Sequence, residues 1–165
     1  MKIVVISDTH ICGKIDKFPG NLLDDIKSAD LVIHTGDFVE EECLKGLKVI
    51  AKEVRAVHGN MDSEDLKKKL PEKDVFKIGA YKIAIAHGSG APNNIISALT
   101  ETFKLEHPNL IIFGHSHTAF NQKIKDTLFF NAGSLFDKLY SKFNSYGLIE
   151  INDGIEAKII KINNE

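Results

Sequence analysis

The 165-residue sequence has very little arginine and a nearly balanced charge. Arg55 is its single arginine, and 21 Lys and Arg stand against 23 Asp and Glu, giving a formal net charge of −2. Arginine is the preferred side chain for bidentate contacts to phosphates and base edges. The one basic run, Lys67-Lys68-Lys69, would fan out around a helix and is interpreted as a solvated face. Stable nucleic-acid binding is therefore not expected.

Cysteine and long apolar runs are also scarce. Cys12 and Cys43 form no Cys-x-x-Cys pair, so free thiols in a reducing compartment are expected. Cys12 is interpreted as an ordinary small buried residue. No stretch reaches the roughly 18 apolar residues that cross a bilayer, and Met1-Lys2 leads into a short strand-like run instead of a secretory leader. A cytoplasmic protein that does not span a membrane is the expectation.

The order of apolar runs predicts one α/β domain over residues 1–165. In the first half, strands are expected at 2–7, 31–35 and 54–58, alternating with helices at 19–29, 40–52 and 63–70. This order is typical of a parallel sheet.

The second half of the sequence favours hairpins. They are expected at 75–78 with 82–86, at 119–125 with 128–131, and at 146–151 with 155–162. Asn152-Asp153-Gly154 indicates a type I′ turn in the last of them. A helix at 93–106 and a strand at 110–113 complete the pattern. We expect two mixed β-sheets packed together, with helices on their outer faces.

Side chains that bind metals follow five of the strand-like runs. In chain order they are Asp8, His10, Asp37, Asn60, His87, His115 and His117. In an open α/β sheet, ligands bind outside the carboxyl ends of the strands. All five clusters can therefore converge on one crevice, which is what an enzyme holding two metal ions needs.

Two of these clusters carry a spaced pair of ligands. In Asp8-Thr9-His10, extended geometry would point both side chains the same way; the alternative is an Asx-turn with His10 on the surface. Gly114-His115-Ser116-His117 is the stronger signal, because two imidazoles after an apolar strand have few structural reasons to exist. Its alternative is a polar strand end with one His on each side of the sheet.

Each of the remaining three residues is weak evidence by itself and becomes significant only together with the two spaced pairs. A carboxylate such as Asp37 can bridge two cations, although the residue can also cap a helix. Asn60 offers a neutral oxygen ligand and a free amino group, or is a turn residue in left-handed geometry. His87 can be an ordinary histidine at a strand end.

The motifs Asp8-x-His10, Gly36-Asp37, Gly59-Asn60, His87-Gly88 and Gly114-His115-x-His117, in this order, resemble the calcineurin-like metallophosphoesterase superfamily. Gly59-Asn60-Met61-Asp62 and Asn131-Ala132-Gly133-Ser134 resemble its small bacterial and archaeal phosphodiesterases. The resemblance implies a four-layer αββα sandwich and two divalent metal ions. One ion would be held by Asp8, His10, Asp37 and His117. Asp37 would bridge to the second, completed by Asn60, His87 and His115.

The implied activity is hydrolysis of phosphodiester bonds by hydroxide held on the two metals, with Asn60 also in a catalytic role. Imidazole ligands favour transition ions over Mg²⁺; Mn²⁺ or Ni²⁺ is expected first, with Fe²⁺, Co²⁺ and Zn²⁺ open. A small phosphodiester is the expected substrate, while its identity and any homo-oligomer stay open. The alternative is a weakly or non-catalytic interaction scaffold, resembling the retromer subunit of the same superfamily.

One position departs from the family pattern. Many members have a His after the Asn, thought to protonate the leaving oxygen, and this chain has Met61 there. His58 is a candidate substitute, but it and His34 are interpreted as partly buried strand histidines. Asp62 matches the family's acidic position, where orienting a neighbouring His is one role. Without a general acid, activated leaving groups and diesters should be preferred.

Overall fold

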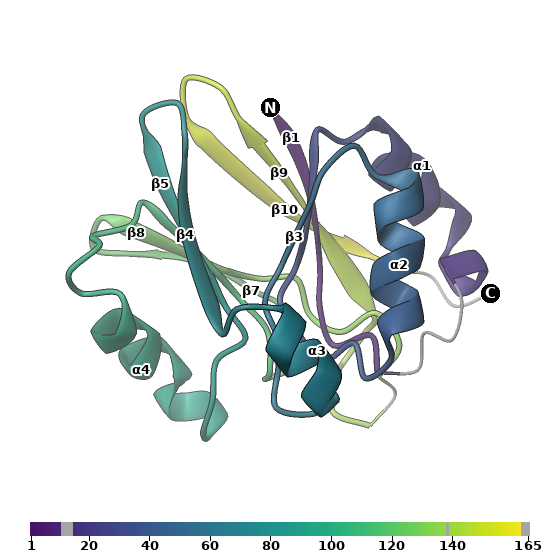
Figure 1. Cartoon of the computed structure of the whole chain (residues 1–165). Coiled ribbons are helices and arrows are strands. Elements are labelled where there is room, and N and C mark those ends of the chain that lie inside the picture. The colour runs from purple at the N-terminus through teal and green to yellow at the C-terminus, as the bar shows by residue number, and fades with distance from the viewer. Residues whose placement is uncertain (11–14, 138, 163–165) are drawn as a thin grey trace.

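Two five-stranded sheets form the centre of the computed structural model, which describes residues 1–10, 15–137 and 139–162 (Figure 1). The first sheet has the strand order β10-β9-β1-β2-β3. Its strands are β1 (Lys2–Ile6), β2 (Leu31–His34), β3 (Val54–Ala56), β9 (Ser145–Ile151) and β10 (Ile155–Lys161). β1, β2 and β3 are parallel, and β9 runs antiparallel to both β1 and β10. The predicted βαβαβ unit and C-terminal hairpin are therefore confirmed.

The second sheet has the order β4-β5-β6-β8-β7. Its strands are β4 (Lys73–Ile78), β5 (Tyr81–Ala86), β6 (Leu110–Phe113), β7 (Phe120–Ile124) and β8 (Thr127–Asn131). β5, β6 and β8 are parallel, whereas β4 and β7 lie antiparallel at the edges. Both predicted hairpins are present, so each sheet is mixed, as expected.

Helices cover the outer face of each sheet. α1 (Gly20–Ser28), α2 (Glu41–Ile50) and α3 (Glu64–Lys69) share one core with the first sheet, and α4 (Ile95–Thr102) packs on the second (Figure 1). Short 3-10 turns, η1 (Ile15–Lys17) and η2 (Pro92–Asn94), precede α1 and α4. The architecture is the expected αββα sandwich. No helix among the described residues is long and apolar enough to cross a membrane.

The central strands are buried on both faces, because side chains alternate between two cores. In β1, Ile3 and Val5 join the core between the sheets, while Val4 and Ile6 join the core beneath α1 and α2. This explains why β1 reads as a continuous apolar run and not as an alternating one.

The fourth helix is shorter than its sequence pattern suggested. The prediction was 93–106, but residues 92–94 form a 3-10 turn and the helix ends at Thr102. Thr102 donates its hydroxyl to the Ala98 carbonyl at 2.9 Å, a local bond that competes with the helical ladder. Further on, Pro108 disfavours the right-handed helical conformation in the residue before it, and His107 has a left-handed φ of 47°.

A glycine brings the two sheets together where the site lies. A Cβ at Gly114, which follows β6, would collide with the Ser7 hydroxyl and lie 2.9 Å from both Asp8 Oδ2 and Thr35 Oγ1. The end of β6 therefore packs directly against the ends of β1 and β2. This contact places the ligand-bearing loops of both sheets side by side.

Candidate metal centre

All seven predicted ligands lie in segments that follow a strand, and five of them meet at the carboxyl ends of β1, β2, β5 and β6. These five are Asp8, His10, Asp37, His87 and His117. Two groups of three donors form there: one of Asp8, His10 and His117, the other of Asp8, Asp37 and His87. Asn60 and His115 form a separate pair beside them.

The first group has the spacing of ligands around one ion. His117 Nε2 lies 3.3 Å from Asp8 Oδ1 and 3.1 Å from His10 Nε2. His10 Nε2 is 4.0 Å from Asp8 Oδ1. Donor atoms bound at about 2.0–2.2 Å to one ion lie roughly 3–3.5 Å apart. The three side chains can thus hold a cation with little movement.

The second group shares a carboxylate with the first. His87 Nε2 is 3.3 Å from Asp37 Oδ2 and 4.0 Å from Asp8 Oδ1. Asp37 Oδ2 also lies 3.8 Å from His10 Nε2. Each of the two carboxylates therefore has an imidazole of both groups within 4.0 Å. This is the arrangement that a carboxylate bridge between two ions requires.

Two buried polar atoms of the centre lack any hydrogen-bond partner. Among the described residues, Asp8 Oδ1 and His87 Nε2 are the buried side-chain atoms left without one. An unsatisfied buried polar group costs about 1–3 kcal/mol, and both atoms face the same space. Imidazole and carboxylate together suit divalent transition ions. The residues present therefore fit a metal.

The Nε2 atoms of His87 and His117 face the centre, where, among the described residues, His87 Nε2 has no hydrogen-bond partner and His117 Nε2 contacts His10 Nε2. His87 Nδ1 donates to the Thr35 carbonyl at 2.7 Å, and His117 Nδ1 bonds Asp137 Oδ2 at 2.5 Å. Each bond fixes the tautomer and leaves a lone pair on Nε2. Sequence analysis missed Asp137, because no spacing links it to His117 and only the fold brings the two together.

His115 and Asn60 form the second pair. His115 Nε2 lies 3.1 Å from the Gly90 carbonyl, which can only accept, so Nε2 donates and Nδ1 keeps its lone pair. Nδ1 is 3.1 Å from Asn60 Oδ1, and the His115 and His87 ring centroids are 5.3 Å apart. Asn60 has no positive φ, so its left-handed turn alternative is wrong.

Opposite charges and burial shift the pKa values of these groups. The Asp8 carboxylate, 3.3 Å from His117 Nε2, raises the pKa of His117 to about 9 with the aid of Asp137 and against the opposing effect of burial. Burial lowers the pKa of His87, but Asp37 and Asp8 outweigh it and raise that pKa. For Asp37, burial raises the pKa, and the stronger pull of His87 and the Met61 amide lowers it.

The metal-free protein should lose stability as the pH rises from about 6.5 to about 9. Because the folded-state pKa of His117 is about 9 against an ordinary 6.5, its contribution is complete below pH 6.5 and is lost as the pH rises through 9. For a half-buried group, solvent screening reduces the effect to roughly 1–2 kcal/mol, or about 3–6 °C in melting temperature. Thermal unfolding with a chelator present measures it.

Asp137→Asn tests the cause of this dependence. The variant removes one of the two carboxylates that raise the pKa of His117, so the melting temperature should change less between pH 6.5 and 9. Asp153→Asn, in the distant hairpin turn, is the matched control and should behave as wild type. Identical pH profiles for wild type and Asp137→Asn would contradict the assignment.

Five of the seven predicted ligands have a left-handed backbone. Their φ angles are 52° at Asp8, 39° at His10, 58° at Asp37, 66° at His115 and 53° at His117. The extended geometry expected for Asp8 to His10 is therefore wrong, and a left-handed turn brings both side chains to the centre. Non-glycine residues in this region carry strain of about 1–3 kcal/mol each, and such strain gathers at functional sites.

Asp62 holds two of the ligand loops together. This buried carboxylate accepts the amide protons of Asp37 at 3.0 Å, Val39 at 2.8 Å and Gly59 at 2.7 Å. Within the described ranges it bonds no histidine, so the expected role of orienting a His is wrong. Asp62 instead fixes the backbone that carries Asp37 and Asn60. The helix-cap alternative for Asp37 is also wrong, since α2 begins after Glu40.

The other histidines and cysteines differ in their surroundings. His34 is buried, accepts the Gly36 amide on Nδ1 at 3.1 Å and stacks on Phe38. Burial holds its pKa well below the usual value, so it is a neutral core histidine.

His58 is half-buried and lies beyond the end of β3 instead of within the strand. Cys43 is buried, and the expectation for Cys12 lies outside the described residues.

The chain is similar to known proteins along most of its length. Residues 1–154 match the model of the calcineurin-like phosphoesterase superfamily domain. A probable metallophosphoesterase of Methanocaldococcus jannaschii is 36% identical over 98% of this chain and 82% of that protein. A phosphodiesterase of the same organism is 29% identical over 81% of this chain and 83% of that protein. Wild-type Vps29 of Entamoeba histolytica complexed with Zn²⁺ has a TM-score of 0.76 at 26% identity, over 99% of this chain and 100% of that chain.

Proposed function

This chain belongs to the calcineurin-like phosphoesterase superfamily, and we propose on that premise that it is a phosphodiesterase that works with two divalent metal ions. The observation that carries the proposal is the pair of unpartnered buried atoms, Asp8 Oδ1 and His87 Nε2, between two groups of carboxylate and imidazole donors. A purely structural site would have no need for donors left open to a shared space.

We assign the ligands as two sets that share one carboxylate. Asp8, His10, Asp37 and His117 would hold the first ion, and Asp37, Asn60, His87 and His115 would hold the second. When bound, the ions would supply an acidified water and would neutralise charge on the phosphoryl oxygens. The Zn²⁺ complex of the Entamoeba relative supports a divalent ion in this fold.

The protein's own residues bind and orient the substrate. Asn60 is exposed at the mouth of the centre, so its amino group can donate to a phosphoryl oxygen. Asp137 and the Thr35 carbonyl keep His117 and His87 in one tautomer, and Asp62 fixes the loop of Asn60 through Gly59. Each of these contacts exists before a substrate arrives, so the site is preorganised.

The proposal predicts a preference for good leaving groups. Met61, 58% exposed, occupies the family's general-acid position and cannot donate a useful proton. A general acid is worth about 10²–10⁴-fold, and an aryl oxide leaves without one. We expect kcat/KM for bis(4-nitrophenyl) phosphate to exceed that for an alkyl phosphomonoester by at least roughly 10²-fold. Equal or faster turnover of the monoester would refute this preference.

Metal analysis of the purified protein, paired with the same assays, tests the metal requirement. Chelator-treated protein should be inactive, and Mn²⁺ or Ni²⁺ should restore hydrolysis, with Fe²⁺, Co²⁺ and Zn²⁺ as the other candidates. Treated protein that keeps its activity without any added ion would refute a metal-dependent reaction.

A protein-binding scaffold is the second candidate, because the chain also resembles Vps29. Met61, Leu139 and Tyr140 are exposed apolar side chains, and Tyr140 lies next to His117, with ring centroids 6.0 Å apart. Other exposed apolar residues lie singly on separate elements, such as Val49 on α2 and Leu105 after α4. Metal-loaded protein that hydrolyses no chromogenic diester would favour the scaffold.

A further inference from the structure

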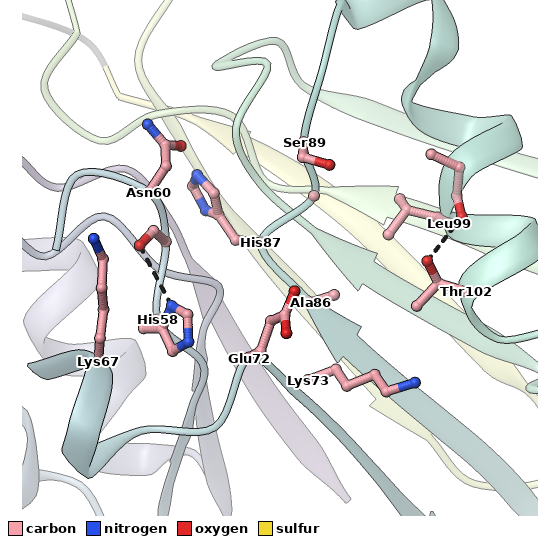
Figure 2. A pocket seen from close by; sticks show the side chains of 13 residues that line it. His58, Asn60, Lys67, Glu72, Lys73, Ala86, His87, Ser89, Leu99 and Thr102 are labelled. Atoms are coloured by element: carbon pink, nitrogen blue, oxygen red, sulfur yellow. Dashed lines mark hydrogen bonds between the residues drawn. The ribbon is translucent and has the colours of Figure 1, made fainter.

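A cavity of about 250 Å³ adjoins the candidate metal centre (Figure 2). Asn60 and His87 line it and also belong to the proposed ligand sets, so the cavity lies beside the centre. Ligand pockets for drug-sized molecules span about 300–1,000 Å³. This cavity therefore suits a single ring or a short polyol and not a longer chain.

The walls of the cavity differ in chemistry. Ala86 at the end of β5 and Ala98 and Leu99 of α4 give one apolar wall. His58 and Glu72, from the segment between β3 and β4, line the opposite side. Figure 2 shows the Glu72 carboxylate directed into the space between His58 and Ala86. An arm bound here would have a C–H face against one wall and polar groups facing the other.

Glu72 is the charged group of the lining that has no contact of its own. No hydrogen bond or ion pair involves its carboxylate within the part of the chain that the structure describes. The two lysines of the lining are engaged elsewhere: Lys67 Nζ is 3.3 Å from Glu64 Oε1, and Lys73 Nζ lies over the Phe103 ring, 5.6 Å from its centroid. A carboxylate only accepts hydrogen bonds, so it attracts hydroxyl donors and repels a second anion.

We propose that this cavity is the subsite for one arm of the phosphodiester and that Glu72 selects an arm bearing hydroxyl groups. Glycerol and ribose share this chemistry and fit the size. The inference rests on the proposed function, which places the phosphate at the metal centre. It concerns the affinity of the cavity for the arm, so it is tested by measuring binding and not hydrolysis. Glu72 is a specificity-determining residue that touches the arm and not the reacting atoms.

The test uses three phosphomonoesters whose single arm must lie beside the phosphate. Glycerol 1-phosphate and ribose 5-phosphate carry hydroxyls, while propyl phosphate has a three-carbon arm without them. Isothermal titration calorimetry on the metal-loaded protein should give Kd values about tenfold lower for a hydroxylated ligand than for propyl phosphate. Comparing the Kd values of glycerol 1-phosphate and ribose 5-phosphate shows whether the cavity prefers a glycerol arm or a ribose arm.

Glu72→Ala should reduce this preference to about threefold or less while binding of propyl phosphate is kept. The matched control is Glu156→Ala, which removes an exposed carboxylate on β10 that does not line the cavity. Equal affinity of wild type for all three ligands, no binding of any, or an unchanged preference in Glu72→Ala would each overturn the inference. Hydrolysis of the chromogenic diester is measured separately, so a loss of activity leaves the comparison of the three affinities intact.

Discussion

Asp37→Asn is expected to abolish metal-dependent phosphodiester hydrolysis, lowering kcat/KM by more than roughly 10³-fold. Loss of an outer partner of a metal ligand typically costs 10–100-fold, and Asp37 is a candidate ligand itself. Its Oδ2 faces His87 at 3.3 Å and His10 at 3.8 Å. In the variant an amide nitrogen, which cannot bind metal, takes the place of one of the carboxylate oxygens.

The fold should survive this change, because the retained oxygen can still accept the Met61 amide, 2.8 Å from Asp37 Oδ1 in the wild type. Steady-state kinetics and bound metal per chain are the measurements, and circular dichroism checks the fold. Asp65→Asn, on the exposed first turn of α3, should retain full activity. His117→Ala should repeat the loss. Full activity in both purified ligand variants would exclude the site.

Asp62→Ala is expected to destabilise the protein by about 3–5 kcal/mol, because it leaves three amide groups, two of them buried, without their charged acceptor. For a chain of this size the melting temperature should fall by roughly 6–20 °C. Activity should fall as well, because Asp62 holds the amides of Asp37 and Gly59 in place. Thermal unfolding followed by circular dichroism gives the first quantity, and kcat/KM the second.

Asp62→Asn keeps the shape of the side chain but removes its negative charge. The one oxygen of the asparagine amide can still accept hydrogen bonds from two of the three backbone amides. The variant should melt between Asp62→Ala and wild type. Asp65→Ala, an exposed carboxylate three residues away, should change the melting temperature by little. An Asp62→Ala protein that melts within about 2 °C of wild type would show that the three bonds do not carry the loop structure.

The layered fold was predictable because its signals are local. Strands β1 and β6 are short apolar runs, and each predicted hairpin has its turn residues between two strand-like runs. The last turn was predicted less well: three residues join β9 to β10, and none of Asn152, Asp153 and Gly154 has a positive φ. The predicted type I′ turn is therefore wrong, although the hairpin itself is confirmed.

The ligand residues of the candidate site were predictable from the sequence, but the hydrogen bonds that hold them in place were not. Strands that run parallel place their carboxyl ends at one edge, which explains why Asp8 and Asp37 lie together after β1 and β2. His87 follows β5 of the other sheet and meets them because the ends of the two sheets pack together at Gly114. The bond from His117 to Asp137 and the three amides on Asp62 depend on which loops the fold brings together. No local pattern encodes such contacts, so they required the structure.

The left-handed backbone of the five ligands has a consequence for how this chain can change over evolutionary time. Glycine tolerates such a φ without strain, and asparagine does so better than most residues. Substitution to glycine at Asp8, His10, Asp37, His115 or His117 would thus relax the backbone, whereas most other side chains would keep the strain. In a descendant that abandoned metal chemistry, glycine at these five places would be tolerated and would relieve that strain. The present residues hold the chain below the stability that its fold can reach.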